Sequence, residues 1–194
     1  MLNRLNWTAV VLICLLATGT YAASGNLVKK QYEKHRTHFG MKLGINNLGT
    51  ARVDDVHYNT NVGLSGGFYF DFVVSKNLFW SLTFDFQDLQ FFQEREAMLN
   101  INIGIKPAFY HKNGKIGYKP GFMVGLADLG HIGPLKRTQY VTMKCFFELI
   151  FFTEQKYVFS WELAVWGTSH CFDSEHDISL GPFFQLRAGL MFLN

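Results

Sequence analysis

The stretch GGFYFDFVVSKNLFWSLTFDF, residues Gly66–Phe86, decides the fold. Its first half carries phenylalanine at every second position, at Phe68, Phe70 and Phe72, and apolar residues alternate again from Trp80 onward. Alternation with a period of two predicts β-strands, and the intervening Ser-Lys-Asn suits a tight turn. The stretch therefore predicts a β-hairpin with one apolar face. The solvent that this face meets decides whether the protein is soluble or embedded in a membrane.

The same alternation recurs along most of the chain, while helical periodicity is absent from segments of comparable length. Eight strands are predicted, at His38–Asn46, Asn61–Val74, Leu78–Gln87, Met98–Tyr110, Ile116–Ala127, Tyr140–Phe152, Tyr157–Trp166 and Ile178–Phe192.

The connections between these segments alternate between long and short. Long loops on one side and tight turns on the other are typical of up-and-down barrels in outer membranes. We therefore expect an all-β fold, an eight-stranded antiparallel up-and-down transmembrane β-barrel. The predicted long connections are Asn47–Thr60, Asp88–Ala97, Asp128–Gln139 and Gly167–Asp177, and the short ones are Ser75–Asn77, His111–Lys115 and Thr153–Lys156.

The polar faces of the strands differ from an ordinary water-exposed surface. They are rich in glycine, which weakens strands but leaves room in a crowded interior. They also carry nearly balanced charges, and buried charges persist only when they are paired. We therefore expect a filled barrel interior of paired charges, which we favour over a proton or ion path. This barrel-interior charge network comprises Asp71, Asp85, Lys106, Lys119, Lys144, Glu148, Glu162 and Arg187, and Lys42 lies on the same face.

The apolar faces place Trp80, Tyr118 and Trp161 toward the short turns. Aromatic residues with a polar group favour the boundary between membrane and water. With the glycine-rich polar face, this favours apolar faces that meet lipid. A soluble lipocalin-like barrel, with its apolar faces turned inward around an apolar ligand, stays open as the alternative.

Composition and the first residues bound the remaining possibilities. Charged residues make up only 17% of the 194 residues, and the net charge of +3 does not indicate a nucleic-acid partner. A positively charged N-terminal stretch, MLNR, and the short apolar run after it predict a cleaved signal peptide over residues 1–22. Residues 23–37 are expected to form a short N-terminal periplasmic tail outside the barrel, and residues 38–194 the outer-membrane β-barrel.

The stretch LNINIGIKPAFYHKNGKIGYKPGFMVGLA, residues Leu99–Ala127, resembles the central part of PorT-type outer-membrane β-barrel domains of Bacteroidota. FYFDFVVSKNLFWSLTFDF resembles the hairpin that precedes it in these OmpA-like small barrels, and ISLGPFFQLRAGLMF resembles their closing strand. The resemblance implies localisation in the cell outer membrane of a Gram-negative envelope and a role accessory to envelope transport.

The predicted loop GTSHCFDSEHD, residues Gly167–Asp177, holds the densest set of possible ligands. His170, Cys171 and neighbouring acidic residues could bind a metal, but their spacing matches no zinc signature. A solvated polar loop is favoured, and we predict no metal or cofactor. Ser169 and His170, with Glu175, supply residue types used in nucleophilic catalysis, so a lipid A-modifying outer-membrane enzyme is a second alternative.

The function predicted from these observations is that of a non-enzymatic integral outer-membrane barrel. Its work would be structural or adhesive, through four extracellular loops, or accessory to envelope transport. The expected partners are outer-membrane lipid and lipopolysaccharide, the barrel-assembly machinery and other envelope proteins. No nucleic-acid partner is expected.

Overall fold

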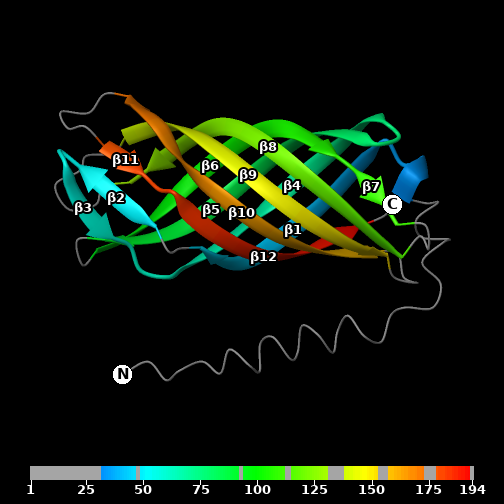
Figure 1. The fold of residues 1–194 in the computed structure, drawn as a ribbon, viewed down its shortest axis with the longest axis horizontal. Coiled ribbons are helices and arrows are strands. Elements are labelled where there is room, and N and C mark those ends of the chain that lie inside the picture. Colours follow the sequence, from blue (N-terminus) through cyan, green and yellow to red (C-terminus); the bar gives the residue numbers. More distant parts are fainter. Residues whose placement is uncertain are drawn as a thin grey trace, which may run out of the picture.

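The computed structural model describes residues 32–46, 49–91, 94–111, 115–130, 138–152, 157–172 and 178–192, and shows an elongated β-barrel (Figure 1). Neighbouring barrel strands along the chain pair antiparallel, in the order β6-β5-β4-β1-β12-β10-β9-β8. Pairing of β6 with β8 closes the wall. The barrel strands are β1 (Thr37–Asn46), β4 (Gly63–Ser75), β5 (Leu78–Phe91), β6 (Glu94–Pro107), β8 (Ile116–Leu129), β9 (Thr138–Phe152), β10 (Tyr157–Phe172) and β12 (Phe183–Phe192).

The predicted fold class is confirmed, because these eight strands form a closed antiparallel barrel. The short strand β7 (Phe109–Tyr110) follows β6 after Ala108 and pairs with the start of β8. Both β6 and β7 pair with β8 and lie within the one segment predicted as the fourth strand. We therefore count them as one strand of the wall.

The hairpin of β4 and β5 has the register expected from its alternation. Phe68 pairs with Phe84, Phe70 with Leu82 and Phe72 with Trp80. The turn differs from the expected three-residue loop. Ser75 pairs with Leu78, the register shifts between Val73 and Ser75, and only Lys76 and Asn77 form the turn. The bulge absorbs one residue, so the apolar faces stay aligned although the loop is shorter.

The strands run further toward the long-loop end than predicted. Most of the connection expected at Asp88–Ala97 is strand, since β5 continues to Phe91 and β6 begins at Glu94. The predicted loop at Gly167–Asp177 likewise begins as strand, because β10 extends to Phe172. Strand lengths of 14 to 16 residues in β5, β6, β9 and β10 exceed the about 9–11 residues that cross a membrane. The barrel therefore projects beyond an apolar layer at this end.

A separate sheet caps the same end of the barrel. It contains β11 (Ile178–Leu180), β2 (Thr50–Val53) and β3 (Val56–Asn59), in that order. The first long loop is therefore a hairpin, and its turn residues Asp54 and Asp55 have φ of 47° and 68°, as a two-residue primed turn requires. The predicted eighth strand is interrupted at Gly181-Pro182, where Gly181 has φ of 104°. Because proline has no amide hydrogen to donate, the wall pairing stops there and β11 pairs with β2 instead.

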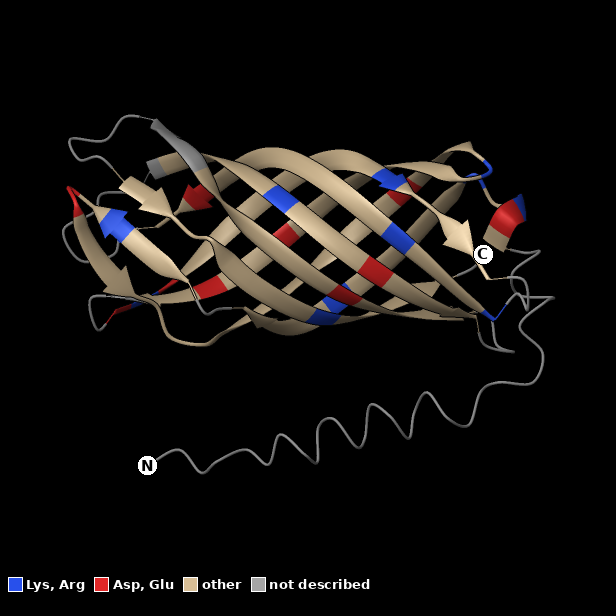
Figure 2. Ribbon diagram, in the orientation of Figure 1, with Lys and Arg blue, Asp and Glu red and all other residues tan. Residues whose placement is uncertain are grey.

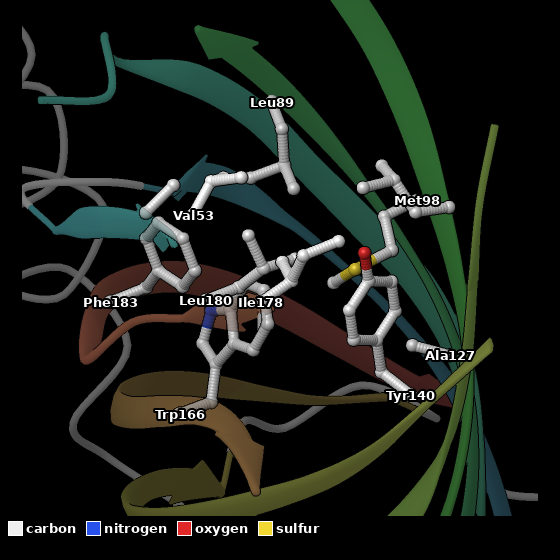
Figure 3. Packing of buried hydrophobic residues seen from close by; sticks show 11 residues of the cluster. Val53, Leu89, Met98, Ala127, Tyr140, Trp166, Ile178, Leu180 and Phe183 are labelled. Carbon is white, nitrogen blue, oxygen red and sulfur yellow. The ribbon is translucent and has the colours of Figure 1, made fainter. Parts of the chain in front are cut away.

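Apolar side chains fill the space beneath this sheet (Figure 3). Val53, Ile178 and Leu180 of the cap pack with Trp166 and Phe183 of the barrel, and all are buried. The rings of Trp166 and Phe183 stack with centroids 4.5 Å apart. The cap is thus held by a small hydrophobic core of its own at the barrel mouth.

At the opposite, short-turn end, one residue of the predicted tail packs inside the barrel. Residues 32–34 form a helical turn, and Tyr32 is fully buried among Phe79, Phe152 and Val158. His38 Nε2 lies 2.8 Å from the carbonyl oxygen of Tyr32. The prediction of a tail outside the barrel is therefore wrong for Tyr32, which is buried inside it, and for Thr37, which is the first residue of β1. Burial of a large aromatic side chain favours its insertion there.

Candidate functional site: the ion-paired barrel interior

Charged residues of both signs lie along the middle of the barrel strands (Figure 2). They alternate with the outward apolar residues, so the period of two sends every one of them inward. Each of the nine charged side chains is at most 4% exposed. The set comprises the eight residues predicted from sequence together with Lys42, and the structure brings all of them into one connected network.

Asp71 of β4 is the acidic centre nearest to the short turns. Lys106 Nζ lies 2.8 Å from one carboxylate oxygen and Lys119 Nζ lies 2.9 Å from the other. The hydroxyl of Ser81 donates a hydrogen bond of 2.6 Å to the same carboxylate. Two cations and a hydroxyl therefore compensate one carboxylate, as burial of a charge demands.

Lys42 of β1 joins the charges around Asp71 to a second group of charges around Arg187. Its ammonium lies 2.6 Å from Glu148 of β9 and 2.7 Å from Glu162 of β10. Glu148 is also 3.8 Å from Lys106. The network is therefore continuous from Asp71 to Glu162.

Arg187 of β12 is the centre of this second group of charges. Its Nη1 lies 2.5 Å from Asp85, and its Nη2 lies 2.6 Å from Glu162. Lys144 adds a contact of 2.7 Å to Glu162 and a longer one of 3.8 Å to Asp85. The planar guanidinium thus links carboxylates on two different strands, a task to which its fixed donor geometry is suited.

Neutral polar residues extend the network toward the cap. The Asn102 amide donates hydrogen bonds of 3.3 Å to Thr83 and 3.4 Å to Asp85, and accepts one of 2.9 Å from the Thr142 hydroxyl. At the mouth, the indole of Trp166 donates a 2.9 Å hydrogen bond to Asn46. The bond from Trp166 joins a buried polar residue of β1 to the apolar cluster under the cap.

Aromatic rings cover several of the buried ammonium groups. Lys119 Nζ lies 4.0 Å from the ring centroid of Phe79, and Lys42 Nζ lies 4.6 Å from that of Tyr69. Lys106 Nζ lies 5.4 Å from the ring centroid of Phe146. Such contacts add cation–π attraction where the ammonium has lost water. A side chain at Gly121 would overlap the Phe146 ring, so glycine at that position makes room for it.

Several contributors to the site were not singled out from sequence. The sequence places Lys42 on the inward face but the predicted network does not include it, although its period-two position marks it as well as the other eight residues. Tyr32 and Phe146 had no usable signal, because one lies in a segment without a strand pattern and the other is an apolar residue on a polar face.

The charges of the network are compensated within the barrel. Each described charge of the network has an opposite charge within 4.0 Å, and apolar clusters occupy the described interior at both ends. Paired charges between two apolar clusters fit a barrel whose interior is filled by side chains rather than a wide aqueous pore. Within the described ranges, no group of three or more His, Cys, Asp or Glu residues is placed to hold a metal ion.

The possible ligands of the fourth predicted long loop fall largely outside the described residues. Ser169, His170 and Cys171 have a described backbone in β10, but their side chains are not described, and Asp173, Glu175 and His176 lie outside the described ranges. The metal and lipid A-modifying alternatives therefore stay untested predictions.

The outer wall is apolar over a wide band. Its residues, the alternating partners of the charged ones, are exposed although they are large and hydrophobic. A lipocalin-like barrel would have these two faces exchanged, so the described fold contradicts that alternative. The band includes Phe68, Phe84, Leu99, Ile101, Ile103, Ile105, Phe122, Val124, Leu126, Phe147, Leu163 and Leu186. In the described chain, no helix is long and apolar enough to cross a bilayer.

Comparison with solved structures supports the fold. The chain is similar to Neisserial surface protein A (NspA), with a TM-score of 0.58, 9% sequence identity and coverage of 80% of this chain and 97% of that chain. It also matches Ail, the attachment invasion locus protein of Yersinia pestis, with a TM-score of 0.46, 14% identity and coverage of 81% and 100%. No family model matches the sequence, and no curated protein is significantly similar to it.

The chain has the fold of small outer-membrane β-barrels. At 9% identity the likeness extends to the fold and not to a particular activity. What this barrel does must therefore be argued from its own residues.

Proposed function

We propose that the chain is an integral outer-membrane protein without enzymatic activity, whose sealed barrel holds a capped end at the cell surface for a structural or adhesive role. The observation that carries this proposal is the inverted arrangement of the barrel. Ile101, Leu126 and Leu163 are 54–57% exposed on the outside, while nine paired charges are buried inside. Such an outer band is stable in hydrocarbon and would aggregate in water.

Aromatic residues near the short turns support this placement. Phe72 packs against Trp80 with ring centroids 5.5 Å apart, and Phe109 stacks on Tyr118 at 5.1 Å. Trp and Tyr rings at one edge of an apolar band are typical of a membrane boundary. The short turns would then face the periplasm and the capped end the outside.

The cap supplies the surface for contact with other molecules. Its edge strand β3 carries exposed Val56 and His57, and Val62 follows in the connection to β4. Val56 and Val62 are 51% and 49% exposed, so the cap offers apolar side chains to a partner beside an edge of β3 that is unpaired in the described chain. A role accessory to envelope transport is the second candidate, and it rests on the resemblance to PorT-type barrels.

Insertion of a short epitope tag tests both the membrane and the orientation. A tag between Asp54 and Asp55 should be detected on intact Gram-negative cells that express the protein. The matched tag between Lys76 and Asn77, in the short turn, should be detected only after permeabilisation. The chain should also require detergent for extraction and show heat-modifiable gel mobility. Recovery of the mature chain in the soluble periplasm would contradict the proposal.

Conductance in planar bilayers tests the sealed interior separately. The purified barrel should give no steady open state. A stable conducting state would show that the charges line a path, and the scaffold role would then fail although the membrane location stands.

A further inference from the structure

A groove of about 380 Å³ opens on the outer wall near the capped end. It lies across β8, β9 and β10, beside the segment that joins β11 to β12. Its residues on β8, β9 and β10 belong to the outward face, apart from Trp166 and Thr168, and Leu180 of β11 lies buried at its base. The main lining residues are Phe122, Met143, Cys145, Val165, Gly167 and Pro182.

The groove exists because small residues lie between larger ones where two strands separate. Pairing of β10 with β12 ends at Trp166 and Phe183, and the chain at Gly181-Pro182 then turns away toward the cap. Gly167 contributes no side chain there, and Cys145 pairs directly with Val165 on the neighbouring strand. The exposed thiol of Cys145 and the bare backbone of Gly167 therefore leave a depression in the wall.

The depression does not lead into the barrel. Trp166 is only 3% exposed and stacks on Phe183, which closes the wall behind the groove. The polar groups at its upper edge are already used, because the Leu180 amide donates a 2.8 Å hydrogen bond to the Thr168 hydroxyl. A ligand that offers hydrogen bonds would gain little from these groups.

The chemistry of the lining indicates an apolar, flexible occupant. None of the described lining residues is charged, and Phe122, Met143 and Val165 are 38–45% exposed as groove walls. The volume falls within the range of about 300–1,000 Å³ that is usual for small-ligand sites. A hydrocarbon chain can fill such a groove, and it needs no polar partner there.

We propose that this groove binds an acyl chain of lipid A. The inference rests on the proposed function, which places the outer wall in the bilayer and the capped end outside. The groove adjoins β11 of the cap, so it would lie in the outer leaflet, whose lipid is lipopolysaccharide. The acyl chain would stay longer in the groove than on the convex parts of the apolar band, because in the groove it contacts protein on several sides.

Photocrosslinking in intact cells tests the site. A p-benzoylphenylalanine replacing Met143 places the reactive ketone at the groove edge, and the same residue replacing Leu163 places it on the band of β10 outside the groove. Illumination should give a lipid A adduct from position 143 several-fold more abundant than that from position 163. Cys145→Phe, which fills the groove, should reduce the adduct at position 143, whereas Cys145→Ala should leave it.

Each other outcome has a distinct meaning. Equal lipid A adducts at both positions, or an adduct at 143 that Cys145→Phe leaves unchanged, would overturn the groove proposal while the membrane location stands. A phospholipid adduct at position 143 would overturn lipid A as the occupant. An adduct at position 163 alone would show that the groove is not occupied. Absence of lipid adducts at both positions, with the chain outside the membrane fraction, would overturn the proposed function itself.

Discussion

Arg187 and Glu162 are direct cross-strand partners on β12 and β10, and the Arg187 guanidinium contacts the Glu162 carboxylate through Nε at 3.0 Å and Nη2 at 2.6 Å. This two-point contact lies inside the barrel, where both side chains are at most 2% exposed. The same guanidinium also reaches Asp85 on β5. The Arg187 side chain therefore links β12 to both β10 and β5.

Arg187→Leu should destabilise the barrel strongly. It would leave Asp85 and Glu162 buried with fewer cationic partners, and loss of one partner of a buried ion pair costs about 3–5 kcal/mol. The free energy of unfolding, measured by urea titration in lipid vesicles, should fall by that amount. Arg95→Leu is the control, because Arg95 is 64% exposed and its ion pair with Asp88 at 3.2 Å contributes at most about 1 kcal/mol. Equal effects of the two changes would contradict a stabilising network.

Phe70→Lys should oppose insertion into the membrane. Phe70 lies on the outward face of β4, paired with Phe39 and Leu82, and a lysine in the middle of a lipid-facing band costs about 2–4 kcal/mol. Folding into vesicles should become less favourable by this amount. Val56→Lys on the cap should change the same measurement by less than about 0.5 kcal/mol. A barrel that tolerates both equally would not present Phe70 to lipid.

Tyr32→Ala should open the short-turn end of the barrel. The Tyr32 ring lies 5.3 Å from that of Phe152 and 5.1 Å from Lys119 Nζ, which is fully buried behind it. Modification of Lys119 by a water-soluble amine reagent should rise severalfold, as measured by peptide mass spectrometry. Tyr118→Ala, an outward-facing change near the same end, should leave Lys119 protected. An unreactive Lys119 in the Tyr32 variant would show that other groups seal this end.

Because the Tyr32 phenol is buried, we also predict that the stability of the barrel falls at high pH. Burial, reinforced by the negative charges of Asp71 and Glu148, raises the pKa of the Tyr32 phenol well above its usual value near 10. The unfolded chain therefore loses this proton at lower pH than the folded chain does. The stability associated with neutral Tyr32 is complete below about pH 10 and is lost as pH rises above it.

Urea unfolding at about pH 8 and about pH 11, on either side of that usual value, measures this effect. The unfolding free energy should fall less in Tyr32→Phe than in the unmodified chain. An equal fall in both would show that the phenol does not contribute.

The amino-acid sequence determined which side chains face inward and which face outward. This information is local, because alternation along a strand sends Asp71 and Phe70 to opposite faces whatever the strand pairs with. It also determined the strand number and the register of the β4–β5 hairpin, since a short turn leaves few alternatives. The inward charges could therefore be named from the sequence, but their partners could not.

Only the tertiary structure decided which charges meet. Lys42 and Glu162 are 120 positions apart in the chain, and closure of the barrel brings them within 2.7 Å. Closure and strand stagger are properties of the whole sheet, so no local pattern records them. The same reason applies to the cap, where Leu180 pairs with Ala51, and to Tyr32, which lies in a segment without a strand pattern. Local alternation set the faces of the barrel, and long-range closure set the contacts that fill it.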